Sequence, residues 1–425
     1  MTDVSSILVI GAGQAAAVAV AALRDQGYQG RVTVVGDEAH APYERPPLSK
    51  DVLAALDTEE PGISVKEADF FSQRDIDLKL GRQVVSLDAE ARQATLSDGT
   101  VIAYDRCLLA TGGTARQLPG FPAQSPQVHY LRTLDDARRL RAALRASRRA
   151  VVIGGGFLGL EVASTARRMG VEVSIIETAA RVLARAVPEA FSDWLQARVA
   201  ASGARLYLGQ AIAQASLGEA GQPARIILAD GTTLDTDMIV VAVGLTPATG
   251  LAQQAGLKLD PVNAGIQVDA QCRSSDPFVY AAGDCTSQLR DGYPGPLRLE
   301  SWQNANEQAR IAACAMVGAP AEPAAYPWFW TDQFDCNVQM LGLPQPDLRY
   351  VTRGQPDPQG PAPKFIMLGM RDGRPCHALA VNAGGDLRAL RPLLERALPV
   401  DAQRFTDESV AMRAFAKAAL AEAAG

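Results

Sequence analysis

Residues 7–16 read ILVIGAGQAA, and this stretch decides the fold. The apolar run at 7–10 predicts a buried β-strand, and Gly11 and Gly13 predict a tight turn into an alanine-rich helix. A second apolar strand at 32–35 follows and is closed by Gly36 and Asp37. Strand, glycine turn, helix, strand and acid, in this order, are typical of a dinucleotide-binding α/β unit.

The same order of features returns later in the chain. Residues 150–159 read AVVIGGGFLG, and a strand at 173–176 is closed by Glu177. One glycine motif alone is weak, but two motifs in strand–helix context, each followed by an acid, favour two bound dinucleotides over two empty glycine turns. The pyrophosphates would lie at the helix N-termini, and Asp37 and Glu177 would accept hydrogen bonds from ribose 2′-hydroxyls. Since a carboxylate repels a 2′-phosphate, Glu177 predicts a preference for NADH over NADPH.

An internal repeat supports two similar units. LSDGT at 96–100 precedes an apolar strand and ATG at 110–112, whereas LADGT at 228–232 precedes a strand and AVG at 242–244. Both Asp-Gly pairs predict hairpin turns. From about Ala324 the composition changes to an aromatic cluster, and Gly/Pro-rich turns follow at 353–363. We therefore predict an α/β protein with two Rossmann-like dinucleotide-binding domains (1–115 with 245–323, and 116–244) and a C-terminal α+β domain (324–425).

Composition excludes several classes of protein. The 425 residues are 48% hydrophobic and 21% charged with net charge -6, as in globular proteins without a nucleic-acid footprint. No apolar run has the ~20 residues of a membrane helix, and the first apolar stretch reads as a strand rather than a signal peptide. Six scattered cysteines without a C-x-x-C pair, and three distant histidines, predict a reducing cytoplasm and no metal site.

Several further motifs resemble a known family. APYERPPLSK (41–50), ATG (110–112), VGLTP (243–247) and YAAGDC (280–285) are similar to the flavin disulfide-reductase superfamily. RPPLSK (45–50), LESWQNA (299–305) and PWFW (327–330) resemble the NADH-dependent ferredoxin reductases of the putidaredoxin reductase, rhodocoxin reductase and Rieske dioxygenase type. The resemblance covers almost the whole chain, in both the order and the spacing of its motifs.

The resemblance implies FAD and NADH as cofactors and assigns residues to each. Toward FAD it implies residues that hold the pyrophosphate, bind the adenosine ribose, flank the flavin, lie on the adenine side or bind the ribityl chain. These residues are Gly11, Gly13, Ala15, Ala16, Asp37, Arg45, Lys50, Val84, Ala110, Thr111, Gly112, Arg132, Gly283, Asp284 and Trp302. Toward NADH it implies Gly154, Gly156, Leu158, Glu161, Glu177, Arg185, Gly244 and Glu300. Lys50 and Glu161 are the catalytic candidates, an expected ion pair beside the hydride-receiving edge of the flavin.

Some of these residues have simpler interpretations. Lys50 is alternatively an ordinary solvated lysine, and Arg132 an arginine at the start of a surface helix. Trp328 and Trp330 are alternatively part of the core of the C-terminal domain, because large aromatic side chains are commonly buried.

The positions of the cysteines define the expected electron acceptor. A disulfide reductase of this kind needs a redox-active cysteine near residues 45–50, but the first cysteine is Cys107, on a predicted core strand. Electrons must then leave the flavin directly, which suits a small [2Fe–2S] ferredoxin that feeds a P450 or a Rieske oxygenase. The alternatives are a rubredoxin reductase, a monodehydroascorbate-type reductase, or a non-catalytic FAD- and NADH-binding redox sensor.

The resemblance also implies where the ferredoxin docks. We expect it near Trp302 and Trp330, where the FAD-binding and C-terminal domains meet. Because the chain is acidic, a local basic patch is needed to attract an acidic ferredoxin. Arg290, Arg298 and Arg310 bracket Trp302 and are the candidates for this patch. No nucleic acid or membrane partner is expected, and the sequence leaves the oligomeric state open.

Overall fold

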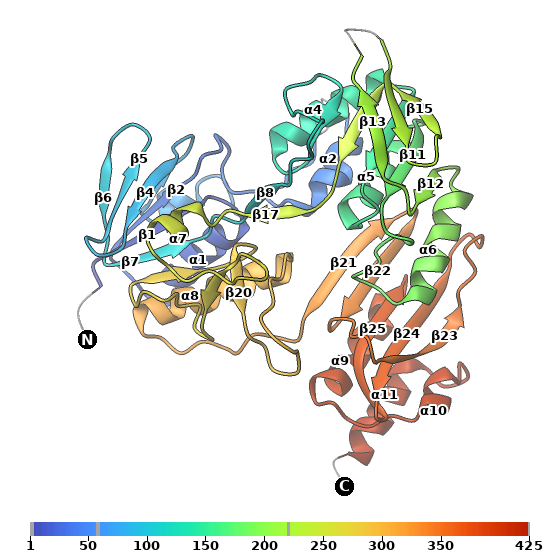
Figure 1. The fold of residues 1–425 in the computed structure, drawn as a ribbon. Coiled ribbons are helices and arrows are strands. Elements are labelled where there is room, and N and C mark those ends of the chain that lie inside the picture. Colours follow the sequence, from blue (N-terminus) through green and yellow to red (C-terminus); the bar gives the residue numbers. More distant parts are fainter. Residues whose placement is uncertain (1–3, 57–59, 219–221, 424–425) are drawn as a thin grey trace. The chain divides into compact units, whose positions relative to one another are not determined.

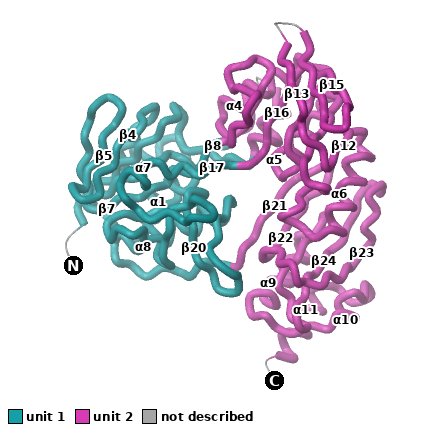
Figure 2. The backbone as a smooth tube through the Cα atoms, in the orientation of Figure 1, with its two compact units in different colours: residues 1–46, 62–114, 245–325 teal, residues 47–61, 115–244, 326–425 magenta. Residues whose placement is uncertain are grey.

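The computed structural model describes residues 4–56, 60–218 and 222–423. Its chain divides into two compact units, shown in different colours in Figure 2. Unit 1 joins residues 1–46, 62–114 and 245–325, and unit 2 joins 47–61, 115–244 and 326–425. The segment 47–61 therefore packs with unit 2, although it follows the first dinucleotide motif in sequence. The predicted division into three domains groups the chain by motif rather than by contacts, and it stays a prediction.

Unit 1 is built on a five-stranded parallel sheet (Figure 1). Its strand order is β19 (Val279–Ala281), β7 (Arg106–Leu109), β1 (Ser6–Ile10), β2 (Arg31–Val35) and β3 (Ile76–Lys79). Strands β1, β2 and β7 are almost continuous apolar runs, as expected for parallel strands covered on both faces. The strands predicted at 7–10 and 32–35 are confirmed.

Two layers cover the faces of this sheet. One face packs against helices α1 (Gln14–Asp25) and α8 (Trp302–Val317), whose alanines allow close approach. The other face packs against the antiparallel strands β4 (Val84–Asp88), β5 (Gln93–Leu96) and β6 (Val101–Ala103) and the helix α7 (Gly250–Gln254). The remaining elements are α3 (Phe70–Gln73), β8 (Gly113–Ala115), β17 (Leu245–Pro247), β18 (Ile266–Val268) and β20 (Thr286–Gln288).

Unit 2 repeats this architecture and adds a second sheet. Its parallel sheet has the order β12 (Arg205–Leu208), β11 (Glu172–Glu177), β10 (Arg149–Ile153), β16 (Met238–Val241) and β9 (Val128–His129). Helices α4 (Leu134–Ala146), α5 (Phe157–Arg168) and α6 (Glu189–Ala201) and the antiparallel strands β13 (Ile212–Ser216), β14 (Ala224–Leu228) and β15 (Thr233–Thr236) accompany it. The Asp-Gly hairpins predicted in the two units join β5 to β6 and β14 to β15, with Gly99 and Gly231 at positive φ.

The C-terminal part of unit 2 is a five-stranded antiparallel sheet with helices. The strand order is β21 (Trp328–Gln333), β22 (Cys336–Leu341), β25 (Arg374–Val381), β24 (Lys364–Arg371) and β23 (Arg349–Gln355). Helices α9 (Gly384–Glu395) and α11 (Met412–Glu422), with α10 (Ala402–Thr406), form a core with this sheet. Two parallel sheets and an antiparallel C-terminal sheet confirm the predicted fold class. Among the described residues, no helix combines the length and the apolar composition needed to cross a bilayer.

Candidate functional site

The two glycine turns have the same backbone geometry. Gly11 has φ +106° and Gly154 has φ +113°, a region that side chains rarely tolerate. A Cβ at Gly11 would lie 2.2 Å from the carbonyl oxygen of Ala110, and one at Gly154 would lie 2.4 Å from that of Ala242. Both turns therefore require glycine, because the main chain passes directly against the neighbouring strand.

Each turn delivers an open helix N-terminus. The N-cap residues are Gly13 for α1 and Gly156 for α5, and neither supplies a side-chain cap. A Cβ built at Gly156 meets nothing within 4 Å, and at Gly13 the nearest group is a guanidinium nitrogen of Arg45 at 4.0 Å. Amide N–H groups at such a helix end bind phosphate. Both cradles therefore fit a dinucleotide pyrophosphate, as predicted for FAD and NADH.

The acid that follows the second motif is held in place by main-chain amides. Glu177, at the end of β11, accepts a hydrogen bond from the amide of Gly155 at 2.8 Å and one from the amide of Ala179 at 2.8 Å. These bonds fix the carboxylate beside the glycine turn, where a ribose hydroxyl is expected to bind. Asp37 is exposed after β2, so its side chain is accessible to a ligand.

Arg45 belongs to a charged cluster that sequence reasoning did not identify. Its Nη2 lies 2.7 Å from Oε1 of Glu38, and the hydroxyl of Tyr43 donates to Oε2 of Glu38 at 2.5 Å. Burial opposes the charge of Arg45, but its attraction to Tyr43 and Glu38, with a contribution from Asp284, raises the pKa of the guanidinium. Arg45 therefore stays cationic, which suits the neighbourhood of a pyrophosphate or a flavin.

The predicted ion pair between Lys50 and Glu161 is present. Lys50 follows the 3-10 helix Pro46–Ser49 and precedes α2 (Asp51–Ala54), whereas Glu161 lies in the second turn of α5. The Nζ of Lys50 lies 2.9 Å from Oε1 of Glu161, and their side chains are 15% and 9% exposed. The interpretation of Lys50 as a solvated surface lysine is therefore wrong.

Two hydroxyl groups complete the surroundings of Glu161, and neither was identified from the sequence. Ser49 donates to Oε2 at 2.5 Å, and Thr331 of β21 donates to Oε1 at 2.5 Å. Ser49 was inside a motif quoted for the resemblance, so its neighbourhood to Lys50 was a signal. Thr331 carried no such signal, because only the tertiary structure brings it to α5.

The buried side-chain amide of Gln308 holds the Gly283–Asp284 motif of unit 1 in place. Gly283, at φ +87°, donates its N–H to Oε1 of Gln308 at 2.8 Å. The same oxygen accepts from the hydroxyl of Thr286 at 2.9 Å and from the side-chain amide of Asn304 at 3.1 Å. Asp284, the predicted ribityl ligand, is partly exposed directly after this glycine. Gln308 therefore fixes the loop that bears Asp284. Sequence reasoning did not identify this residue.

The remaining predicted residues of unit 1 lie in varied surroundings. Ala15 and Ala16 are buried in α1, and Ala110, Thr111 and Gly112 follow β7, with Thr111 donating to the carbonyl of Ala248 at 2.7 Å. Val84 was expected to touch adenine, but its side chain is buried in the core. The predicted place of Val84 on the adenine side of FAD stays a prediction. Trp302 is the first residue of α8.

In unit 2, the other predicted residues lie near the second motif or before α4. Leu158 is 37% exposed in the first turn of α5, Arg185 is exposed, and Gly244 has φ +112°. Arg132 precedes α4, and its amide donates to Asp136 at 3.0 Å. Their predicted ligand contacts stay predictions.

The predicted basic patch near Trp302 is wrong in two of its three arginines. Arg290 is 9% exposed, forms an ion pair with Glu307 at 3.5 Å and donates to the carbonyl of Ala325 at 2.9 Å. Arg298 is 15% exposed and forms an ion pair with Glu300 at 2.5 Å. Both arginines serve the internal packing of unit 1, because each pairs with a carboxylate of the same unit. Arg310 alone of the three is exposed.

The cysteines offer no redox centre. All six are free thiols, and all except Cys376 are buried. Burial raises the pKa of the Cys107 and Cys285 thiols, which makes them unreactive. Within residues 4–56, 60–218 and 222–423, no group of three or more histidine, cysteine or acidic side chains could hold a metal ion.

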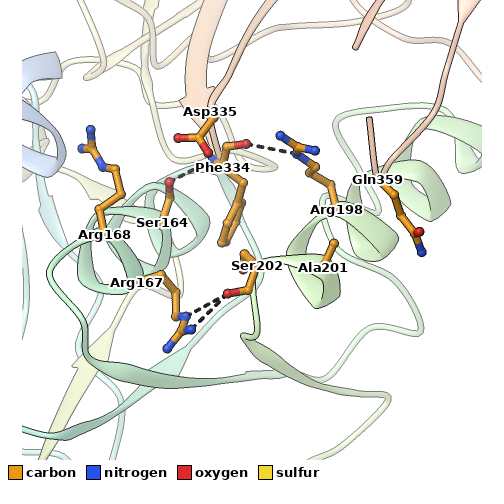
Figure 3. Close-up of a pocket in the computed structure, with 9 residues that line it drawn as sticks. All are labelled: Ser164, Arg167, Arg168, Arg198, Ala201, Ser202, Phe334, Asp335 and Gln359. Atoms are coloured by element: carbon orange, nitrogen blue, oxygen red, sulfur yellow. Dashed lines mark hydrogen bonds between the residues drawn. The ribbon is translucent and has the colours of Figure 1, made fainter. Parts of the chain in front are cut away.

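A cavity of about 340 Å³ lies apart from the glycine turns in unit 2 (Figure 3). Three arginines are among its lining residues, but two of them are bound to main-chain carbonyls. Arg167 donates to Ser202, and Arg198 donates to Phe334, as the dashed lines in Figure 3 show. These bonds join α5 and α6 to the loop after β21, so we interpret the cavity as a structural junction rather than a ligand site.

The chain matches known proteins over nearly its whole length. Residues 5–309 match the pyridine nucleotide-disulphide oxidoreductase family, and residues 328–416 match the reductase C-terminal family. The ferredoxin–NAD(+) reductase component of the anthranilate 1,2-dioxygenase system of Burkholderia cepacia is 39% identical over 411 residues, which are 96% of this chain and 98% of that protein.

Solved structures agree with this similarity. A chain of the covalent putidaredoxin reductase–putidaredoxin complex is 33% identical with a TM-score of 0.91, over 98% of this chain and 99% of that chain. The ferredoxin reductase for the CYP199A2 system of Rhodopseudomonas palustris is 36% identical with a TM-score of 0.90, over 98% of this chain and 100% of that chain. These values confirm the resemblance read from the motifs, and the chain belongs to the pyridine nucleotide-disulphide oxidoreductase family.

Proposed function

We propose that this protein is an NADH-dependent, FAD-containing ferredoxin reductase. The observation that carries the proposal is the buried Lys50–Glu161 pair, in a chain that has two open phosphate cradles and no cysteine before Cys107. The cradles account for two dinucleotides. Because no cysteine stands near residues 45–50 to receive electrons, we infer that they leave the flavin directly for an external acceptor.

The residues of unit 1 fit FAD, and those around the second glycine turn fit NADH. The N-terminus of α1, with Asp37, Arg45 and Asp284, would bind the pyrophosphate, ribose and ribityl groups of FAD. The N-terminus of α5, with Glu177, would bind NADH. A flavin supplies the conversion from two-electron to one-electron chemistry, and the protein binds and orients the reactants.

Lys50 and Glu161 are proposed to assist hydride transfer. Both are largely buried, so their charges act in a medium of low polarity and are weakly screened by salt. The pair is neutral as a whole, yet it places a fixed dipole at one point of unit 2. We infer that this dipole orients the nicotinamide or the flavin edge during transfer.

The proposed acceptor is a small [2Fe–2S] ferredoxin that feeds a P450 or a Rieske oxygenase. The names of the Burkholderia cepacia and Rhodopseudomonas palustris proteins, which belong to a dioxygenase system and to the CYP199A2 system, support this proposal. Arg310 is the exposed arginine of the predicted patch. Replacing it with glutamine is expected to lower the rate of ferredoxin reduction and to leave NADH-to-ferricyanide turnover unchanged, because ferricyanide needs no docking surface.

The test is NADH-dependent reduction of cytochrome c with and without an added [2Fe–2S] ferredoxin. We expect turnover to depend on the ferredoxin. Rubredoxin and monodehydroascorbate serve as competing acceptors, and a higher rate with either one would favour that alternative. A protein that binds FAD and NADH but reduces none of these acceptors would be a redox sensor. The six free thiols are consistent with the reducing cytoplasm that we propose as its location.

A further inference from the structure

Helix α5 meets strand β21 and the loop after it along a seam of three paired positions within unit 2. The rings of Phe157 and Phe329 lie 4.7 Å apart, Thr331 donates to Glu161 at 2.5 Å, and the amide of Phe334 donates to Ser164 at 2.9 Å. On the helix these positions are spaced by four and three residues, so they share one face. On the strand, positions 329 and 331 share one face because side chains alternate.

The buried Glu161 carboxylate has one donor from this seam and two from residues 49–50. Oε1 receives the Lys50 ammonium at 2.9 Å and the Thr331 hydroxyl, and Oε2 receives the Ser49 hydroxyl. A distance of 2.5 Å from each hydroxyl is typical of a bond to an ionised carboxylate. Ser49, Thr331 and Glu161 are all buried, so water cannot replace these donors easily.

Both hydroxyl groups are themselves held in place. The main-chain carbonyl of Ser49 accepts from the hydroxyl of Thr165 on α5 at 2.8 Å, which ties the residue before Lys50 to the helix that bears Glu161. The hydroxyl of Thr331 accepts from the side-chain amide of Gln333 at 3.1 Å, so its proton is directed toward Glu161. Each carboxylate oxygen is thus fixed from a different element.

We propose that Thr331 and Ser49 are positioning residues for the Lys50–Glu161 pair, and that the C-terminal sheet thereby supplies part of the hydride-transfer site. The proposal rests on the proposed function. With one hydroxyl donor on each oxygen, the plane of the carboxylate is fixed, and the Lys50 ammonium is held at Oε1. Loss of either hydroxyl frees the carboxylate to rotate, and the ammonium then moves with it.

The experiment compares Thr331→Val, Thr331→Ser and the wild type as FAD-loaded proteins. Valine keeps the shape of threonine without its hydroxyl, whereas serine keeps the hydroxyl. Stopped-flow absorbance gives the limiting rate of flavin reduction by NADH, calorimetry gives the affinity for NAD⁺, and thermal unfolding gives the midpoint. We expect Thr331→Val to slow reduction roughly tenfold with NAD⁺ affinity unchanged, and Thr331→Ser to restore most of the rate.

Ser164→Ala is the matched control, because it removes a hydrogen bond from the same seam without touching Glu161. It is expected to lower the unfolding midpoint and to leave the rate of reduction unchanged. The proposal is overturned if Thr331→Val reduces its flavin at the wild-type rate, or if Thr331→Ser is as slow as Thr331→Val. It is also overturned if Ser164→Ala is as slow as Thr331→Val, since the role would then be structural. If NADH does not reduce the flavin of the wild type, that result refutes the proposed function instead.

Discussion

The Nζ of Lys50 lies 2.9 Å from Oε1 of Glu161, and this pair joins the segment after the 3-10 helix Pro46–Ser49 to α5. The two residues come from distant parts of the sequence, yet both pack within unit 2. A buried ion pair is weak support for stability, because desolvation of the two charges offsets most of their attraction. Its burial beside an open helix N-terminus is therefore better explained by function.

Replacing Lys50 with methionine is expected to slow the reduction of bound flavin by NADH. It leaves the Glu161 carboxylate buried without its cation, which is also expected to lower the free energy of unfolding by about 3 kcal/mol. The double variant Lys50→Met/Glu161→Gln removes both charges and should regain stability without regaining the rate. Stopped-flow absorbance and urea denaturation measure the two effects. Unchanged reduction kinetics in Lys50→Met would remove Lys50 from the mechanism.

Replacing Glu177 with glutamine is expected to relax the preference for NADH. The change removes the charge that repels a 2′-phosphate and weakens the hydrogen bond to the 2′-hydroxyl, together about 1–3 kcal/mol of discrimination. The ratio of kcat/KM for NADH and NADPH measures this quantity. Glu172→Gln, at the exposed start of the same strand, is the matched control and should keep the wild-type ratio. A wild type that uses both coenzymes equally would show that Glu177 has another role.

Replacing Gln308 with leucine is expected to weaken FAD binding. The change leaves the amide of Gly283, the hydroxyl of Thr286 and the side-chain amide of Asn304 without their shared acceptor. The hydroxyl of Thr286 and the side-chain amide of Asn304 keep second acceptors, the carbonyls of Gly283 and Leu299. The unmet buried donor is then the amide of Gly283, at a cost of about 1–3 kcal/mol, so the loop before Asp284 should rearrange. Quenching of FAD fluorescence on binding measures the affinity. Gln303→Leu on the same helix is the control, and equal losses in both variants would contradict a specific role for Gln308.

The buried imidazole of His377 is expected to make the protein sensitive to acid. Burial lowers the pKa of His377 to about 3 from an ordinary value of 6.5. As the pH falls, His377 gains a proton in the unfolded chain at a higher pH than in the folded chain. The stability contributed by neutral His377 is therefore complete above about pH 6.5 and is lost as the pH falls toward 3. At about pH 5 the loss is of the order of 2 kcal/mol.

The variant His377→Gln tests this pH dependence. The variant loses the contact between Nδ1 and the Tyr350 hydroxyl at every pH, so only the difference between two pH values is informative. We expect the fall in the free energy of unfolding between about pH 7.5 and pH 5 to be about 2 kcal/mol smaller than in the wild type. Burial also lowers the pKa of His129, but this histidine is present in both proteins. An equal fall in both would refute the contribution of His377.

The sequence predicted those features that depend on neighbouring residues. Gly11 and Gly154 are required by local backbone geometry, and the strands around them are apolar because both faces of each parallel sheet are covered. The Lys50–Glu161 pair was predicted only through the family resemblance, since no spacing rule connects these positions. The family and the fold class could also be predicted from the sequence, because the motifs occur in a fixed order along the chain.

Features that arise from packing between distant segments escaped prediction. Thr331 reaches Glu161 only because the alternation of β21 matches the turns of α5. Gln308 accepts three hydrogen bonds inside unit 1, whereas the sequence shows only one polar residue among others on α8. Arg290 and Arg298 were expected on the surface, but arginines bury readily when they can pair with nearby carboxylates such as Glu307 and Glu300.

The most direct test of the proposed function is an anaerobic titration of a [2Fe–2S] ferredoxin with NADH in the presence of a catalytic amount of the FAD-loaded protein. NADH supplies two electrons and each ferredoxin accepts one, so we predict about two ferredoxins reduced for each NADH oxidised. The visible absorbance of the iron–sulfur cluster and the 340 nm absorbance of NADH follow both reactions. The proposed function would be contradicted if NADH reduced the flavin but the flavin transferred no electrons to the ferredoxin.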